Sequence, residues 1–256
     1  MTDRPSLTWL RRAEGAPALV IAHRGASAAA PENTLAAFRL AIEKGATIVE
    51  CDVHLSADGV PVVIHDERVE RTTDGCGAVS GLTLAELRQL DAGRWRHVRF
   101  AGERIPTLDE TLALCAGRVR VVVELKRGGG KELVDAALRS ISRTVCDVAV
   151  ISFGPEEVRA TAERRPDLAL GFLIGKGHFV EHGMARALVA ARDIGATFFS
   201  PQHDVVDRTL VEAAHAAGLP VSVWTVDDPA RMTAVGDLGV DAITTNRPEV
   251  ALGLFS

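Results

Sequence analysis

Short apolar runs alternate with amphipathic segments along almost the whole chain. Strands that are buried on both faces read as continuous apolar runs, and strands that alternate with helices favour a parallel sheet. Eight such strand–helix units within 256 residues favour a closed barrel over an open sheet. We therefore expect a single-domain (β/α)₈ TIM barrel over residues 1–256. The expected strands are 18–22, 47–53, 119–125, 147–152, 168–174, 197–200, 220–225 and 240–245.

The segments between these runs are rich in Ala, Leu, Glu and Arg, as expected of helices that cover a sheet. Several begin at residues that commonly cap helices: Asn33, Asp207, and Thr107 with Glu110 three positions later. Several end at a glycine, which is a common helix stop. The expected helices are 33–44, 107–116, 130–143, 155–164, 182–194, 207–217, 228–237 and 247–254.

Residues 54–106 interrupt the alternation. Asp58-Gly59 between two extended runs indicates a hairpin. A turn over 56–59 would pair Leu55 with Val60 and place Glu50 opposite His65. The remainder, about 67–105, is expected to be an insertion above the barrel mouth, and a connection of this length is expected to have a function.

Composition argues against several classes of protein. The formal net charge is −5, no basic stripe is visible and tyrosine is absent, so a nucleic-acid partner is not expected. No run of about 18 apolar residues is present, so no membrane span is expected. The first twenty residues are interrupted by charges, unlike a signal peptide, and the four cysteines are scattered. We expect a reducing, cytoplasmic location. The oligomeric state is left open.

Polar residues at the ends of the predicted strands are the candidates for chemistry, because barrel active sites lie at the carboxyl ends of the strands. Glu50 and Asp52 are two residues apart, so both leave one face of a strand, as do Glu124 and Lys126. Three carboxylates that converge need a counter-charge. Oxygen ligands suit Mg²⁺ or Ca²⁺, so we expect one divalent cation on Glu50, Asp52 and Glu124. For Glu124 an ion pair with Lys126 is the alternative.

Two histidines reach the same rim from different segments. His23 ends the first strand and His65 ends the hairpin, and imidazole suits proton transfer near neutral pH. Arg24 and Lys126 would offset the charge of a phosphate group. Trp224 ends the seventh strand and either walls a substrate pocket or only packs. Two further residues are considered for the site. Glu32 could contact the metal or position a loop, and His54 is more readily explained as a solvated hairpin residue.

Several ordered motifs resemble the glycerophosphodiester phosphodiesterase family, and they extend over nearly the whole chain. They are HRGASAAAPENTLAAF (23–38), ECDVHLSADGVPVVIHD (50–66), RTTDGCG (71–77), DAGRW (91–95), GERIPTLDE (102–110), VVELK (122–126), ISF (151–153), VWTV (223–226) and ITTNRP (243–248). The resemblance implies a (β/α)₈ barrel with an insertion after the second strand.

The same resemblance implies a site and an activity. It places the metal on Glu50, Asp52 and Glu124, makes His23 and His65 the acid–base pair, and puts Arg24 and Lys126 on the phosphate. The activity implied is hydrolysis of a glycerophosphodiester, a small-molecule substrate, to sn-glycerol 3-phosphate and an alcohol.

Four other functions remain open. The same site could form a cyclic phosphate as a lyase, or it could act as a lysophospholipase D. A catalytically dead binding module is a third possibility, although both histidines and all three carboxylates are present. A metal-dependent aldolase or isomerase is the fourth, and the phosphate-type cations argue against it. The sequence does not decide which histidine is the base.

Overall fold

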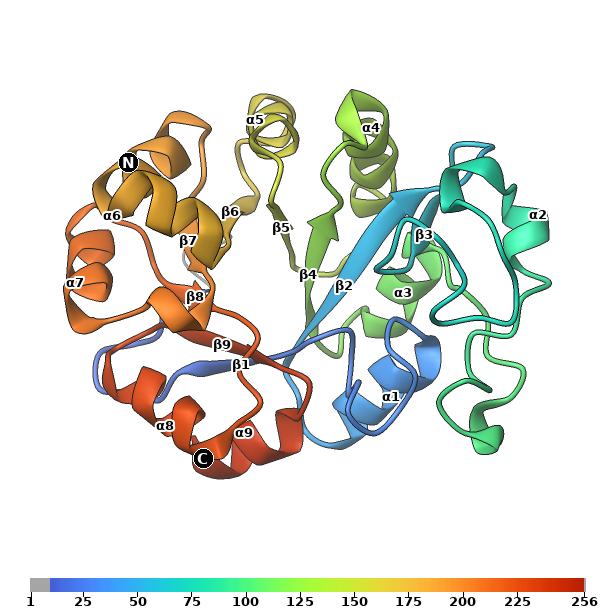
Figure 1. Ribbon diagram of the computed structural model, residues 1–256, viewed down its shortest axis with the longest axis horizontal. Coiled ribbons are helices and arrows are strands. Elements are labelled where there is room, and N and C mark those ends of the chain that lie inside the picture. Colours follow the sequence, from blue (N-terminus) through green and yellow to red (C-terminus); the bar gives the residue numbers. More distant parts are fainter. Residues whose placement is uncertain (1–9, 256) are drawn as a thin grey trace.

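A ring of parallel strands surrounded by helices makes up the fold (Figure 1). The computed structural model describes residues 10–255; the first nine residues, part of the segment expected not to be a signal peptide, lie outside this range. The parallel strands are β1 (Leu19–Ala22), β2 (Ile48–Leu55), β4 (Arg120–Leu125), β5 (Val148–Ser152), β6 (Ala169–Ile174), β7 (Phe198–Pro201), β8 (Ser222–Val223) and β9 (Ala242–Thr245).

The strands are paired in the order β7-β6-β5-β4-β2-β1-β9-β8. Isolated bridges between Phe199 and Val221 and between Gln202 and Trp224 join β7 to β8, so the ring is nearly closed. The predicted TIM barrel is confirmed. The longer helices around it are α1 (Leu35–Glu43), α3 (Leu108–Cys115), α4 (Gly130–Ile141), α5 (Pro155–Arg164), α6 (Lys176–Asp193), α7 (Arg208–Ala216), α8 (Pro229–Asp237) and α9 (Pro248–Leu254).

The alternation of side chains along a strand divides the core in two. On β4, Val121 and Val123 pack outward against the helices, whereas Val122 points into the barrel. Cys51 on β2 likewise faces the helices. Because side chains alternate along a strand, Glu50, which precedes Cys51, and Glu124, which follows Val123, point the opposite way and line the barrel cavity.

The hairpin is present, but its predicted register is wrong by one residue. β3 (Pro61–Val63) runs antiparallel to β2, with Leu55 opposite Pro61, and the Ser56 amide bonds to the carbonyl of Val60. The turn therefore holds three residues, and the last of them, Gly59, has φ +75°. A glycine with positive φ closes such a three-residue turn, which moves every later residue by one place.

The predicted N-cap of α1 is also wrong. Thr34, not Asn33, accepts the hydrogen bond from the helix, at Ala37 N. Asn33 has φ +58° and its side chain turns to Asp52, with Nδ2 to Oδ2 at 2.7 Å. α6 also begins earlier than expected, at Lys176, and is kinked at Gly183.

The insertion folds over a small apolar core of its own, formed by Val62, Ile64, Val69, Val79, Leu87, Ala92 and Ile105. It contains three short helices: η2 (Val79–Gly81), α2 (Leu84–Leu87) and η3 (Val98–Phe100). Thus the long connection is structured, and it lies beside β2 and β3 (Figure 1).

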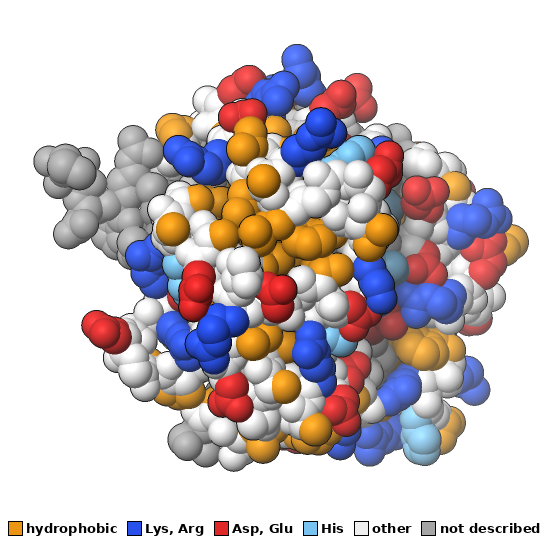
Figure 2. All heavy atoms as spheres, turned by 60° about the vertical axis from the view of Figure 1, so that its left-hand side comes forward, with side chains coloured by type: hydrophobic (Ala, Val, Ile, Leu, Met, Phe, Trp, Pro, Cys, Tyr) orange, Lys and Arg blue, Asp and Glu red, His pale blue; other side chains and the backbone are white. Residues whose placement is uncertain are grey.

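The surface carries charges of both signs. On the face shown in Figure 2, acidic and basic side chains are interspersed around a group of hydrophobic ones, and no broad basic band crosses it. Among residues 10–255, no helix has both the length and the apolar character that a membrane span needs.

Candidate functional site

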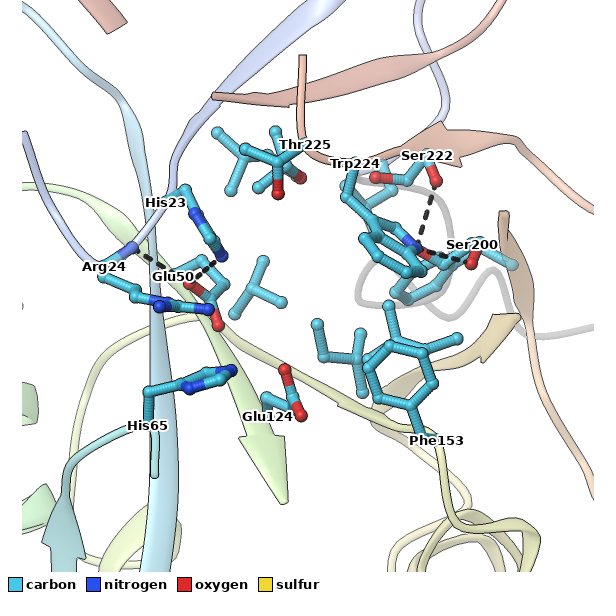
Figure 3. A pocket seen from close by; sticks show the side chains of 17 residues that line it. His23, Arg24, Glu50, His65, Glu124, Phe153, Ser200, Ser222, Trp224 and Thr225 are labelled. Atoms are coloured by element: carbon cyan, nitrogen blue, oxygen red, sulfur yellow. Dashed lines mark hydrogen bonds and ion pairs between the residues drawn. The ribbon is translucent and has the colours of Figure 1, made fainter. Parts of the chain in front are cut away.

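A cavity of about 160 Å³ opens among the carboxyl ends of the strands (Figure 3). One side is polar and includes His23, Arg24, Glu50, His65 and Glu124. The other side and the floor are largely apolar and include Leu10, Ile151, Phe153, Leu173, Phe198 and Trp224. The barrel mouth therefore combines a charged wall with an apolar one.

Three carboxylates meet on the polar side. Asp52 and Glu124 are paired across β2 and β4, and Glu50 lies two residues before Asp52 on the same face. One oxygen from each carboxylate lies within 4.8 Å of the others. All three side chains are buried. The structure thus brings together the three residues that the sequence predicted as metal ligands.

The pKa values record the crowding of negative charge. Burial and the neighbouring carboxylate of Asp52 raise the pKa of Glu50 well above its usual range and that of Glu124 to about 7. Burial also opposes ionisation of Asp52, but Lys126 and Arg24 outweigh it and hold that pKa well below its usual range. Without a further cation, this cluster favours holding a proton.

The donor set fits a divalent cation. Glu50 Oε2 accepts a hydrogen bond from the Arg24 amide at 2.9 Å, whereas Glu50 Oε1 is buried and has no hydrogen-bond partner among residues 10–255. A buried acceptor without a donor is costly, and a cation would satisfy it. Hard oxygen ligands are those that Mg²⁺ and Ca²⁺ take in proteins.

Both predicted phosphate contacts lie at the same carboxylates. Lys126 Nζ lies 2.5 Å from Asp52 Oδ1 and 2.7 Å from Glu124 Oε1. Arg24 Nε lies 3.0 Å from Asp52 Oδ2. Arg24 adopts φ +55°, an uncommon conformation for a residue other than glycine, and such outliers cluster at functional sites. The expected alternative, a Lys126–Glu124 ion pair, is present in the structure.

The two histidines are both anchored through Nδ1. His23 Nδ1 lies 2.7 Å from Asn246 Oδ1, and its Nε2 lies 4.0 Å from Glu50 Oε2. Burial and the positive charge of Arg24 lower the pKa of His23 to about 4. His65 Nδ1 lies 2.6 Å from Asp66 Oδ1, and burial lowers the pKa of His65 as well. Both rings line the cavity.

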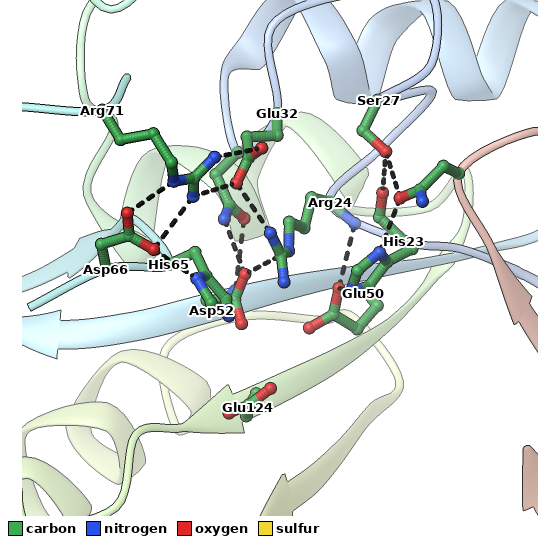
Figure 4. Close-up of polar contacts among 12 residues, drawn as sticks. His23, Arg24, Ser27, Glu32, Glu50, Asp52, His65, Asp66, Arg71 and Glu124 are labelled. Carbon is green, nitrogen blue, oxygen red and sulfur yellow. Dashed lines mark hydrogen bonds and ion pairs between the residues drawn. The ribbon is translucent and has the colours of Figure 1, made fainter. Parts of the chain in front are cut away.

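A belt of alternating charges runs from the insertion to the site (Figure 4). Arg71 forms ion pairs with Asp66 at 2.5 Å and with Glu32 at 2.9 Å. Glu32 also forms an ion pair with Arg24 at 2.8 Å. Hydrogen bonds from Arg71 are the largest cause that lowers the pKa of Asp66, to about 2. Glu32 therefore contacts two arginines.

Sequence reasoning assigned no role to four residues of this region: Asp66, Arg71, Asp227 and Asn246. Asp66 directly follows His65, and Asn246 directly follows the last strand, so their positions were visible signals. Asp227 and Arg71 lie in connections where a charged residue is ordinarily solvated, and only the fold shows their partners.

Trp224 and His54 both have defined contacts. The Trp224 indole N–H donates to the Ser200 carbonyl at 2.9 Å, and its ring packs edge-to-face on Phe153 with centroids 5.2 Å apart. Trp224 therefore lines the cavity and packs at the same time. His54 Nε2 lies 3.0 Å from the His65 carbonyl oxygen, so it is a half-buried support of the His65 segment and not a solvated side chain.

Known proteins share this arrangement of sequence and fold. The chain is 38% identical over 242 residues to a glycerophosphodiester phosphodiesterase of Caldanaerobacter subterraneus, a match that covers 92% of this chain and 97% of that protein. The structure of an Oleispira antarctica phosphodiesterase, in complex with the product sn-glycerol-3-phosphate, is similar with a TM-score of 0.86 and 31% identity, over 93% of this chain and 96% of that one.

A glycerophosphodiester phosphodiesterase of Agrobacterium tumefaciens has a similar structure, with a TM-score of 0.78 and 32% identity over 92% of this chain and 99% of that one. The profile described as "Glycerophosphoryl diester phosphodiesterase family" matches residues 23–250, which include every charged and imidazole side chain of the site described above. The chain therefore belongs to the glycerophosphoryl diester phosphodiesterase family of enzymes.

Proposed function

We propose that the enzyme hydrolyses glycerophosphodiesters to sn-glycerol 3-phosphate and an alcohol, and that it needs one divalent cation. The observation that carries this proposal is that three buried carboxylates, two histidines and two cationic side chains lie together at or beside one cavity. The product bound in the Oleispira antarctica phosphodiesterase, sn-glycerol-3-phosphate, supports the same substrate class here.

Glu50, Asp52 and Glu124 would hold the cation, Mg²⁺ or Ca²⁺. When bound, the cation supplies charge that stabilises negative charge on phosphate oxygens. It would also supply the partner that Glu50 Oε1 lacks and neutralise the repulsion that raises the pKa of Glu124.

The side chains divide the remaining chemistry. Arg24 and Lys126 would contact the non-bridging phosphate oxygens, because both lie at the cluster and carry fixed positive charge. His23 and His65 each present Nε2 toward the cavity, so one can accept the proton of the attacking water while the other donates a proton to the leaving oxygen. The apolar wall of Trp224 and Phe153 would border the carbon skeleton of the substrate.

We also propose a cytoplasmic location and a role in the breakdown of lipid-derived diesters. All four cysteines, Cys51, Cys76, Cys115 and Cys146, are free thiols, which suits a reducing compartment.

The activity is tested on the metal-stripped protein with glycerophosphocholine. Turnover should be absent after chelation, return with Mg²⁺ or Ca²⁺, and fall at least about 100-fold in the E50Q and E124Q variants. E249Q is the matched control, since Glu249 pairs with Lys44 away from the mouth. Phosphorus NMR of the product separates the two reactions: a monoester signal supports hydrolysis, and a lasting cyclic diester signal means the lyase reaction. Full turnover in both variants would end the proposal.

A further inference from the structure

Behind His23 lies a half-buried polar network that the proposed mechanism does not use. Asn246 follows β9, and Asp227 lies in the loop after β8. Asn246 Oδ1 lies 2.7 Å from His23 Nδ1, and Asn246 Nδ2 donates to Asp227 Oδ2 at 2.6 Å. The three side chains therefore form a chain of hydrogen bonds that ends at a carboxylate.

Asp227 is held in one orientation by further donors. Its Oδ1 accepts from the Asn246 amide at 2.8 Å and from the Thr245 hydroxyl at 3.0 Å. The Thr245 oxygen in turn accepts from the Arg247 amide at 3.0 Å, which leaves its own proton for Asp227. Asp227 thus receives three hydrogen bonds from residues 245–246 and cannot rotate without losing them.

The chemistry of this network fixes which atoms of Asn246 and His23 carry the protons. An ionised carboxylate can only accept, so it must face the NH₂ end of the Asn246 amide. The oxygen end then faces His23, and because an amide oxygen can only accept, His23 Nδ1 must carry the proton. Neutral imidazole has one N–H, so Nε2 is left with its lone pair, on the side of the ring nearer to Glu50.

We propose that Asp227 is a positioning residue: acting through Asn246, it selects the tautomer and orientation of His23 that leave Nε2 free to accept a proton. His65 is anchored differently, directly by the carboxylate of Asp66. The inference rests on the proposed role of His23 in catalysis.

The D227N variant tests this inference sharply. Its amide oxygen can keep the bonds from Asn246 N and Thr245, which places its NH₂ against the NH₂ of Asn246. Rotation of Asn246 relieves that clash, brings an NH₂ to His23 Nδ1 and forces the ring proton onto Nε2. We expect kcat to fall by about 10- to 100-fold, below the ~10²–10⁴-fold of a general acid–base group, with KM nearly unchanged.

Two matched variants accompany it. D241N changes a carboxylate away from His23. Asp241 directly precedes β9, lies 2.7 Å from His215 Nε2 and accepts from Val221 N at 2.8 Å, so D241N should lower stability and keep kcat. The D227N/N246D exchange puts the carboxylate beside His23, where it again accepts from Nδ1, so it should recover at least about tenfold of the lost kcat.

Nitrogen-15 NMR of histidine-labelled protein reads the tautomer directly, with the His23 signals assigned from the H23A spectrum. The nitrogen without a proton should be Nε2 in the wild type and in the exchange variant, and Nδ1 in D227N. An unchanged tautomer and unchanged kcat in D227N would overturn the inference. If D227N does not fold, the exchange variant decides: an inactive folded protein, or one protonated at Nε2, refutes it. Full activity of H23A would instead refute the proposed role of His23.

Discussion

Glu50 and Asp52 are two positions apart on β2, and this spacing places both carboxylates on the same face of the strand. Glu50 and Asp52 interrupt an otherwise apolar run, and strand alternation turns both to the inner face of the barrel while Cys51 between them faces the helices. Such a cluster is unfavourable unless positive charge is near it. Arg24 and Lys126 provide that charge for Asp52, but burial and repulsion leave Glu50 and Glu124 with raised pKa values.

Replacement of either histidine should slow the reaction. H23A and H65A are each expected to lower kcat/KM by about 10²–10⁴-fold, because each removes a proton donor or acceptor at the cavity. The measurement is steady-state hydrolysis of glycerophosphocholine with saturating metal. H97A serves as the control, since His97 is exposed in the insertion. Comparable rates in H23A, H65A and H97A would remove the pair from the mechanism.

Metal binding should depend on pH through Glu124. Its pKa is raised from 4.5 to about 7 in the folded, metal-free protein, so the folded state binds this proton more tightly than the unfolded state does. The stabilisation that this proton provides is therefore complete below about pH 4.5 and is lost as the pH rises toward about 7. A cation must displace the same proton, so its stabilising effect should grow over that interval.

Thermal unfolding with and without Mg²⁺ or Ca²⁺ measures this effect. The increase in Tm that the metal causes should rise between about pH 5 and about pH 8 in the wild type and rise less in E124Q. An increase in Tm that is the same at every pH would show that Glu124 does not exchange a proton for the metal.

At the level of elements, the apolar runs predicted all eight parallel strands, and two of the three residues expected to cap helices do so. Thr107 and Asp207 cap their helices as expected. The prediction that Asn33 caps α1 was wrong because its neighbour Thr34 can also cap a helix, and the Asn33 side chain instead donates a hydrogen bond to Asp52 on β2. A tertiary partner decided between two local choices, and local sequence cannot show such a partner.

The hairpin error has a different, local origin. Asp58-Gly59 indicates a turn, but it fits a two-residue and a three-residue loop alike. The Ser56 hydroxyl, which contacts Asp58 at 2.6 Å and accepts from Val60 N at 3.0 Å, stabilises the longer loop. His65 still reaches the cavity, because the last ladder bond runs from the Ile64 amide to the Asp52 carbonyl and His65 lies beyond it.

Arg71 links the insertion to the site through Asp66 and Glu32. R71A should leave Asp66 without its cation and loosen His65, so kcat should fall by about tenfold, within the range measured for residues that orient a functional group. Stability should change by less than about 1 kcal/mol, since Arg71 is 45% exposed. R68A removes a comparable exposed pair with Glu70 and should keep kcat. Equal kcat in both variants would mean that the belt has no part in turnover.

At the scale of the whole molecule, the site is assembled from segments that are distant in sequence. β1, β2, β4 and the hairpin supply the charged wall, whereas β7, β8 and β9 supply much of the opposite side. The residues that break apolar strands could be predicted from the sequence, and they include all three carboxylates. The partners that orient them could not, because Asp227 meets Asn246 only when β8 and β9 pair near the closure of the barrel.

Crystals grown with Mn²⁺ and sn-glycerol 3-phosphate test the central claim most directly, because the anomalous scattering of Mn²⁺ locates the cation without assumptions about activity. One strong peak is expected within about 2–2.6 Å of oxygens from Glu50, Asp52 and Glu124, with the phosphate between His23 and His65. A metal peak away from these three carboxylates, or a phosphate that neither histidine reaches, would contradict it.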